Sequence, residues 1–440
     1  MNPDQFKSKL KSHKDAKKSL SEYYAAFAIA ASFSSPQNLN SRYGMSLGAS
    51  GWVNYSPDMI ASARRFSDLM TKFLGARYGD EKHLKDLIQK TAHNCLAKGT
   101  NASGFEAAVI ESIAESLNQD FEIYLPNRLF TLYPRITPLR IGKVKVLSFA
   151  QLDTEIQTII AGMSNPRPGL SLTFEHNSHQ ILFNLTSMAI AVPSARTMWA
   201  VKVNTSRTHV HEEALWQIGI ATSLMRLSSS NWENIVPRLG DIEPNGVVLD
   251  RFAGDNALLR NGTNLSCGGR RVPGHYFIDK NVSKDLRAAK KQTLFDDVFS
   301  HTSGSLGEQI YNALGWLTKG RQSIDRAERL LYFFTAIEAI LTRQSKDSPV
   351  IDTIARHGSV MLANSIAARP QIAKRFKNLY GYRSSTVHRG ARTASALIVK
   401  EAQFLAENLI CAVLAEADPK QTHNAFSDEL GRASYGLQWP

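Results

Sequence analysis

The spacing of apolar residues predicts that the first quarter of the chain is helical. In residues 1–118, apolar positions recur every three or four residues, which is the period of an amphipathic helix. A run rich in Ser, Asn and Gly at 34–56 lacks that period and predicts a loop, after which Pro57 can open a helix. The helices predicted here are 4–34, 58–75, 81–97 and 104–117.

The middle of the chain changes to strand-like segments rich in β-branched and aromatic residues. Five such segments stand at 121–125, 144–147, 171–174, 181–185 and 199–203. Helical spacing returns at 149–162 and 211–227. We therefore predict a mixed domain over 119–292, whose last part, 260–292, is rich in Gly, Lys and Arg and marks a boundary.

The last third reads as an antiparallel helical bundle. Helical stripes occur at 305–319, 323–343, 349–365, 370–380 and 393–416, and Ser323 can cap the second of them. After Pro419 the chain is polar, and we predict a loosely held tail. The predicted fold class is α+β, with an α-rich, mixed N-terminal region followed by an all-α bundle. The predicted domains are 1–118, 119–292, 293–418 and the tail 419–440.

Positive charge is concentrated in two places. The formal net charge is +13. Residues 1–20 hold six lysines against two acids, which suits either nucleic-acid binding or a solvated helix. Residues 353–400 hold nine Lys and Arg and no acid, whereas the chain average of 39 acids in 440 residues predicts about four. Such concentration favours a nucleic-acid partner over an anionic membrane or an acidic protein.

Few residues suit a metal, a disulfide or a membrane. Cys95, Cys267 and Cys411 lie far apart, without the spacing of a zinc site. His209 and His211, followed by Glu212 and Glu213, form a single cluster that we interpret as structural. We see no secretory signal and no apolar run long enough to span a membrane, so a cytoplasmic protein without cofactor is expected.

One possible acid–base group stands inside the basic region. Arg383 and His388 are five residues apart, and Gly381 and Gly390 flank them. On a straight helix this spacing separates two side chains by about 140°, so we predict a bend, or a two-fold partner, that brings them to one surface. Imidazole can move the proton of an RNA 2′-hydroxyl, and guanidinium can hold phosphate oxygens. The lack of nearby acids disfavours Mg²⁺ chemistry.

Three segments of the last third carry a family resemblance. They are Ala-Leu-Gly-Trp-Leu at 313–317, the helical run at 330–341 and the run at 380–390. Together they resemble the Apea-like branch of the HEPN superfamily, over about 305–417. The resemblance implies a HEPN-like bundle and a metal-independent endoribonuclease that acts as a homodimer. It also implies that Arg383 and His388 are catalytic, with Glu338 beside them on a neighbouring helix. Glu338, a member of this predicted catalytic site, is either a buried acid paired to an arginine or an acid at the edge of its apolar stripe. The sequence departs from many relatives in placing Arg389 directly after the histidine.

The surrounding cations and tyrosines predict an RNA-binding patch. We assign phosphate contacts or base stacking to Lys374, Arg375, Lys377, Tyr380, Tyr382, Arg389 and Arg392. A solvated basic face, and tyrosines that only pack a helix junction, would give the same pattern. We interpret His357 as a surface residue.

The resemblance favours an RNA-cleaving effector of bacterial antiviral defence, abortive infection or a toxin system, with tRNA among its possible substrates. In this interpretation, residues 1–290 sense a phage-derived trigger or partner protein, or restrain the nuclease. One alternative is a non-catalytic HEPN module that binds nucleotide or RNA or supports assembly. Another is a DNA- or RNA-binding regulator.

Overall fold

The fold is described from a computed structural model of the whole chain. The structure describes residues 3–32, 44–46, 52–54, 56–74, 81–116, 120–127, 129–133, 136, 138–148, 151, 154, 172–176, 179–183, 197–205, 209–229, 256–261, 264–269, 276–343, 350–392, 394–436 and 439. The chain divides into two compact units. The first contains residues 1–122 and 202–214, and the second contains 123–201 and 215–440. The predicted boundary near 118 lies close to the limit of the first unit, whereas the one at 292 falls inside the second.

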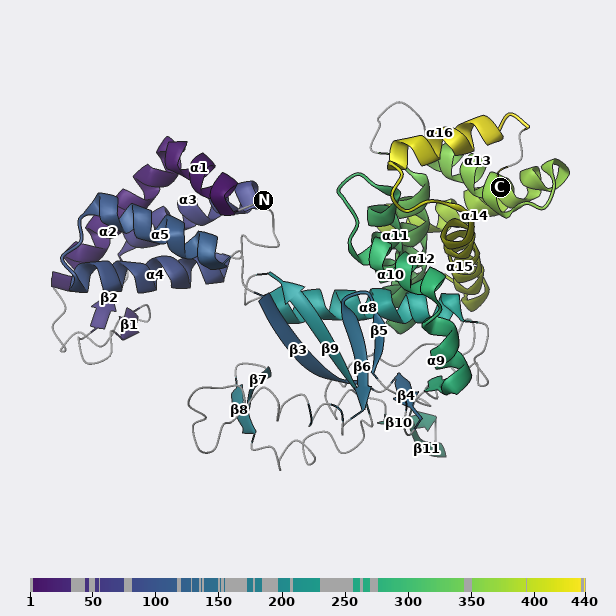
Figure 1. The fold of residues 1–440 in the computed structure, drawn as a ribbon, viewed down its shortest axis with the longest axis horizontal. Helices are drawn as coiled ribbons and strands as arrows, with labels where there is room; N and C mark the ends of the chain where they lie inside the picture. The colour runs from purple at the N-terminus through teal and green to yellow at the C-terminus, as the bar shows by residue number, and fades with distance from the viewer. Residues whose placement is uncertain are drawn as a thin grey trace. The chain divides into compact units, whose positions relative to one another are not determined.

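The first unit is a helical bundle with a small hairpin (Figure 1). Its elements are α1 (Pro3–Ser12), α2 (Lys14–Ser32), β1 (Gly44–Ser46), β2 (Trp52–Asn54), α3 (Pro57–Leu74), α4 (Glu81–Ala97) and α5 (Ala102–Ser116). The helix predicted over 4–34 is two helices that meet at His13. Fully buried Phe27, Phe66 and Phe105 belong to one apolar core, in which Tyr24 stacks on Phe105 at 4.5 Å.

A four-stranded sheet ordered β3-β9-β6-β5 lies mostly in the second unit. These strands are β3 (Asp120–Asn127), β5 (Leu139–Ile141), β6 (Val144–Ser148) and β9 (Thr197–Asn204). The β5–β6 and β6–β9 pairs are antiparallel. Trp199 is fully buried, and its ring meets that of Phe130 edge-on at 5.7 Å.

Three further strand pairs belong to this unit. They are β4 (Phe130–Leu132) with β12 (Tyr276–Ile278), β7 (Leu172–His176) with β8 (His179–Phe183), and β10 (Asn256–Asn261) with β11 (Asn264–Gly269). Helix α8 (Val210–Ser228) follows the sheet, and α9 (Lys280–Leu286) and α10 (Ala289–Phe299) lead into the bundle. Each of the five predicted strands overlaps an observed one. The predicted helix 149–162 lies outside the described residues, except for Gln151 and Thr154.

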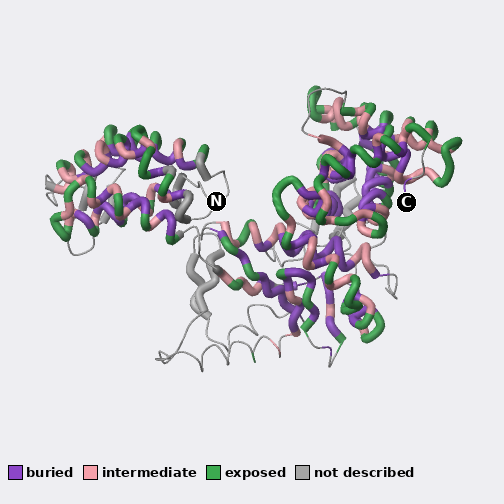
Figure 2. The backbone as a smooth tube through the Cα atoms, turned by 45° about the horizontal axis from the view of Figure 1, so that its top comes forward, coloured by how far each residue is buried: buried purple, intermediate pink, exposed green. Residues whose placement is uncertain are grey.

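The last part of the chain is all helical. It contains α11 (Leu306–Gln322), α12 (Arg326–Leu341), α13 (Val350–Leu362), the 3-10 turn η3 (Ile366–Ala368), α14 (Arg369–Arg389), α15 (Ala396–Glu416) and α16 (His423–Ala433). Buried positions form stripes along these helices (Figure 2). Asp325 caps α12 with bonds from the N–H groups of Ala327 and Glu328, while Ser323, the predicted cap, ends α11 instead.

Two predictions about this bundle are wrong. Helix α14 does not bend at Gly381 but runs on to Arg389. A glycine in an exposed helix interior costs only about 1 kcal/mol, whereas Gly390, with φ of 63°, ends the helix in the left-handed conformation. The tail is not loose, because Phe426 and Leu430 of α16 are fully buried. Their four-residue spacing was the overlooked signal.

Candidate functional site

The predicted catalytic pair lies on one continuous helix. Arg383 and His388 both belong to α14, so their side chains leave its axis about 140° apart. Arg383 is half-buried, and His388 is exposed in the last turn of α14. The structure therefore does not bring the two side chains of one chain together.

Arg383 pairs with Glu338 of α12, as the resemblance implied. Its Nη2 donates to Glu338 Oε2 at 3.2 Å, and the side chains are 24% and 18% exposed. Burial raises the pKa of the Glu338 carboxyl, and the charge and hydrogen bond of Arg383 act against that rise. Of the two interpretations of Glu338, the acid paired to an arginine is the one observed.

The two tyrosines differ in their surroundings. Tyr380 packs edge-on against Phe334 at 5.7 Å, and the guanidinium carbon of Arg383 lies 5.9 Å from the Tyr380 ring centre. Tyr380 thus serves the helix junction and helps to position Arg383. Tyr382 is 44% exposed and Val387 is 50% exposed, so both remain accessible beside the candidate pair.

Acids from other helices neutralise part of the predicted phosphate patch. The pairs are Arg375 with Glu401 (2.7 Å), Lys377 with Asp352 (2.8 Å) and Arg392 with Asp325. Arg375 also lies over the ring of Phe404 at 5.9 Å. The acid-free stretch of sequence therefore does not make an acid-free surface. Lys374 and Arg389 are exposed and make no ion pair with a described residue.

A surface hollow lies beside the Arg392–Asp325 pair. It has a volume of about 780 Å³ and is lined by residues 322–328 together with Arg392 and Ala394. The hydrogen bond from Arg392 lowers the pKa of the Asp325 carboxyl, which keeps the cap of α12 ionised. The ion pair places the exposed side chain of Arg392 at the start of α12, four residues beyond His388 in the sequence.

One of the remaining histidine predictions is wrong. His357 is not a surface residue, since it is 3% exposed between the helices of the bundle. His209, His211, Glu212 and Glu213 lie at the start of α8. Among the residues that the structure describes, no three His, Cys, Asp or Glu side chains gather in a way that could hold a metal ion. None of the described helices combines the length and apolarity needed to cross a membrane.

Comparison with known proteins adds no relative. No family model matches this chain, and neither does any curated protein or solved structure. The HEPN resemblance thus rests on the three sequence segments alone.

The raised pKa of Glu338 predicts a measurable pH dependence. Because the folded carboxyl binds its proton more tightly than the unfolded one, the stability it contributes is present below its ordinary pKa of 4.5 and is lost as pH rises through the folded pKa. We expect Glu338→Gln to flatten this fall in the free energy of unfolding, measured by urea denaturation at several pH values. Glu401→Gln, in a more exposed pair, is the control, and equal slopes for wild type and Glu338→Gln would contradict the assignment.

Proposed function

We propose that the protein is a metal-independent endoribonuclease of the HEPN type, which cleaves RNA by attack of its own 2′-hydroxyl. The observation that carries the proposal is the half-buried Arg383, held by Glu338 and Tyr380 on the same helix as the exposed His388. Exposed Lys374 and Arg389 add positive charge along that helix. Phosphoryl transfer of this kind needs a proton acceptor and a fixed cation.

Each role follows from the chemistry of its group. The imidazole of His388 accepts the 2′-hydroxyl proton, the 2′-oxygen bonds to phosphorus, and the bond to the 5′-oxygen breaks. A proton returned to that oxygen completes the step and leaves a 2′,3′-cyclic phosphate and a 5′-hydroxyl. Arg383 holds the non-bridging oxygens while negative charge builds on them. Glu338 positions Arg383 and does not touch the substrate.

A second copy of the chain completes the site in this proposal. Since Arg383 and His388 of one α14 diverge by about 140°, we assign Arg383 of one subunit and His388 of the partner subunit to one phosphate. Exposed Tyr382 and Val387 on α14 supply apolar surface for such a two-fold contact. The role of residues 1–290 as sensor or restraint in antiviral defence rests on their position ahead of the bundle.

The test is cleavage of total tRNA by the purified full chain in EDTA. We expect products with 2′,3′-cyclic phosphate ends, identified by their resistance to ligation until the cyclic phosphate is removed. A Lys400→Gln variant, which alters an exposed cation of α15 outside the site, should cleave at the wild-type rate. RNA binding without cleavage, both in the full chain and in one activated by phage extract, would refute the nuclease.

The ion pairs favour one alternative function. Arg383, Arg375, Lys377 and Arg392 all bind acids of the protein, as cations with a structural role do. A non-catalytic module that binds RNA or nucleotide, or supports assembly, fits this pairing. Such a module would keep its RNA affinity when His388 is replaced, and it would leave the RNA intact.

A further inference from the structure

A small hollow lies between three helices of the bundle, apart from the site around Arg383. Its volume is about 170 Å³. The end of α12, the first half of α13 and the middle of α16 enclose it. Its polar lining includes Arg343, Thr353, Arg356, His357, Ser427 and Asp428. Two arginines, a histidine, three hydroxyl residues (Thr342 is the third) and a single aspartate thus line one space.

Only one of the two arginines is neutralised by that carboxylate. Arg343 donates to Asp428 and to the carbonyl of Asn424, the latter at 2.8 Å. Arg356 is exposed, and its guanidinium makes no ion pair with any residue that the structure describes. The N-terminal turn of α13 adds partial positive charge. Asp352 in that turn forms its ion pair with Lys377. The lining therefore has an excess of positive charge.

The buried imidazole of His357 lacks a normal partner. Neither of its ring nitrogens makes a hydrogen bond of normal geometry to a described residue, although the side chain is only 3% exposed and the Leu341 carbonyl is close enough to act on its pKa. Burial of the ring, and to a lesser extent the positive charge of Arg356, lower the pKa of His357 to about 4. The nearby Leu341 carbonyl acts in the opposite direction and raises that pKa. The ring is thus neutral at pH 7, with one N–H to donate. A buried N–H donor without a good acceptor destabilises the folded state, and a bound oxyanion would supply that acceptor.

We propose that this hollow is a binding site for the oxyanion of a phosphate group. Arg356 and Arg343 supply the charge, and the N–H of His357 and the hydroxyls of Thr353 and Ser427 supply directed hydrogen bonds. A hollow of this size holds a tetrahedral oxyanion but not a whole nucleotide, so any nucleoside attached to the phosphate would lie outside. The inference does not depend on the proposed nuclease.

The test is calorimetric titration of the full chain with inorganic phosphate, with chloride adjusted to constant ionic strength. We expect saturable binding that weakens about tenfold or more in Arg356→Gln, the loss expected for one charge-assisted hydrogen bond. Arg432→Gln removes an exposed arginine of α16 outside the lining and should leave the affinity unchanged. Arg356 is at the surface, so its variant does not disturb the core.

Two further measurements identify the ligand and the histidine. Titration with adenosine 5′-monophosphate tests whether the hollow accepts a phosphate attached to a nucleoside, and adenosine, which has no phosphate, is its control. If adenosine bound and the two phosphate compounds did not, the proposal would be overturned. Bound phosphate should also raise the pKa of His357, measured by NMR. Its negative charge opposes Arg343, Arg356 and His423, which lower that pKa, and has the same sign as the charge of Asp428 in the lining. No binding at millimolar phosphate, or equal weakening in Arg356→Gln and Arg432→Gln, would overturn it as well.

Discussion

Replacing His388 by alanine is expected to lower the rate of RNA cleavage about a hundredfold to ten-thousandfold, which is the contribution of a positioned acid–base group. Arg383→Ala should cost a similar factor, because it removes the cation that meets the developing charge. His388 is exposed, so its variant should unfold at the wild-type temperature. Initial rates on a labelled tRNA, with melting curves of each variant, provide the measurement.

A composite site makes a sharper expectation for mixtures of the two inactive variants. When Arg383→Ala and His388→Ala chains are mixed and allowed to exchange subunits, half of the dimers contain one chain of each. Each mixed dimer has one site with both residues intact. Cleavage should therefore return to about a quarter of the wild-type rate. Mixtures that stay inactive despite proven exchange would place both residues of a site on one chain, against the geometry of α14.

Arg383→Lys separates catalysis from the structural role of the ion pair. Lysine retains the charge opposite Glu338, but it lacks the planar fork that holds two phosphate oxygens. We expect this variant to keep the wild-type stability and to lose most of its cleavage. Full cleavage by Arg383→Lys would mean that a positive charge at this position is sufficient and that the planar fork of arginine is not required.

The helices of the bundle were predictable because each one buries a single apolar stripe. Leu330, Phe334 and Ile337 recur at helical spacing, and all three are fully buried in α12. The strand at 199–203 was equally clear from its aromatic and β-branched residues, since Trp199 and Val201 are fully buried in the sheet. Elements that bury a regular pattern against the core leave it visible in the sequence.

The candidate site was only partly predictable, because its electrostatics come from distant residues. Glu401 approaches Arg375, and Asp325 approaches Arg392, only after the helices pack. A window of sequence cannot show such pairing. The conformation of α14 was missed for another reason. Two glycines indicated a bend, but only Gly390 adopts a conformation that needs glycine, whereas Gly381 lies in open space on the helix surface.

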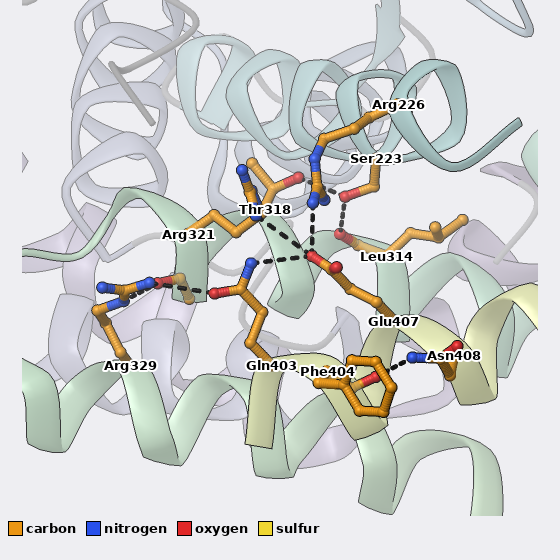
Figure 3. A network of polar contacts seen from close by, with 11 residues as sticks. Ser223, Arg226, Leu314, Thr318, Arg321, Arg329, Gln403, Phe404, Glu407 and Asn408 are labelled. Carbon is orange, nitrogen blue, oxygen red and sulfur yellow. Dashed lines mark hydrogen bonds and ion pairs between the residues drawn. The ribbon is translucent and has the colours of Figure 1, made fainter. Parts of the chain in front are cut away.

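The largest stability effect is expected at Glu407, in a buried network that nothing in the sequence indicated (Figure 3). Glu407 Oε1 of α15 accepts from Arg226 of α8 at 2.7 Å, from Gln403 at 3.0 Å and from Arg321 of α11 at 3.3 Å. Arg329 of α12 donates to Gln403 Oε1 at 3.2 Å. One carboxylate thus joins α8 to the centre of the helical bundle.

Replacing Glu407 by alanine should lower the free energy of unfolding of the second unit by about 3–5 kcal/mol. The Glu407 and Arg321 side chains are 7% and 1% exposed, and that of Arg226 is 11% exposed, so removing the carboxylate withdraws a partner from two largely buried guanidinium groups. Hydrogen exchange measured on peptides of α15 and α8 in the full chain reports this loss locally.

Glu401→Ala is the matched control, because it makes the same substitution on the same helix. Its pair with Arg375 is about one-third exposed (33% and 35%), and such pairs contribute less than about 1 kcal/mol. Helix propensity changes equally in the two variants, so the difference between them isolates burial. If both variants lost the same stability, the network would be no stronger than a surface ion pair. Apolar packing and bonds such as those of Ser223 and Thr318 would then account for the attachment of α8 to the bundle.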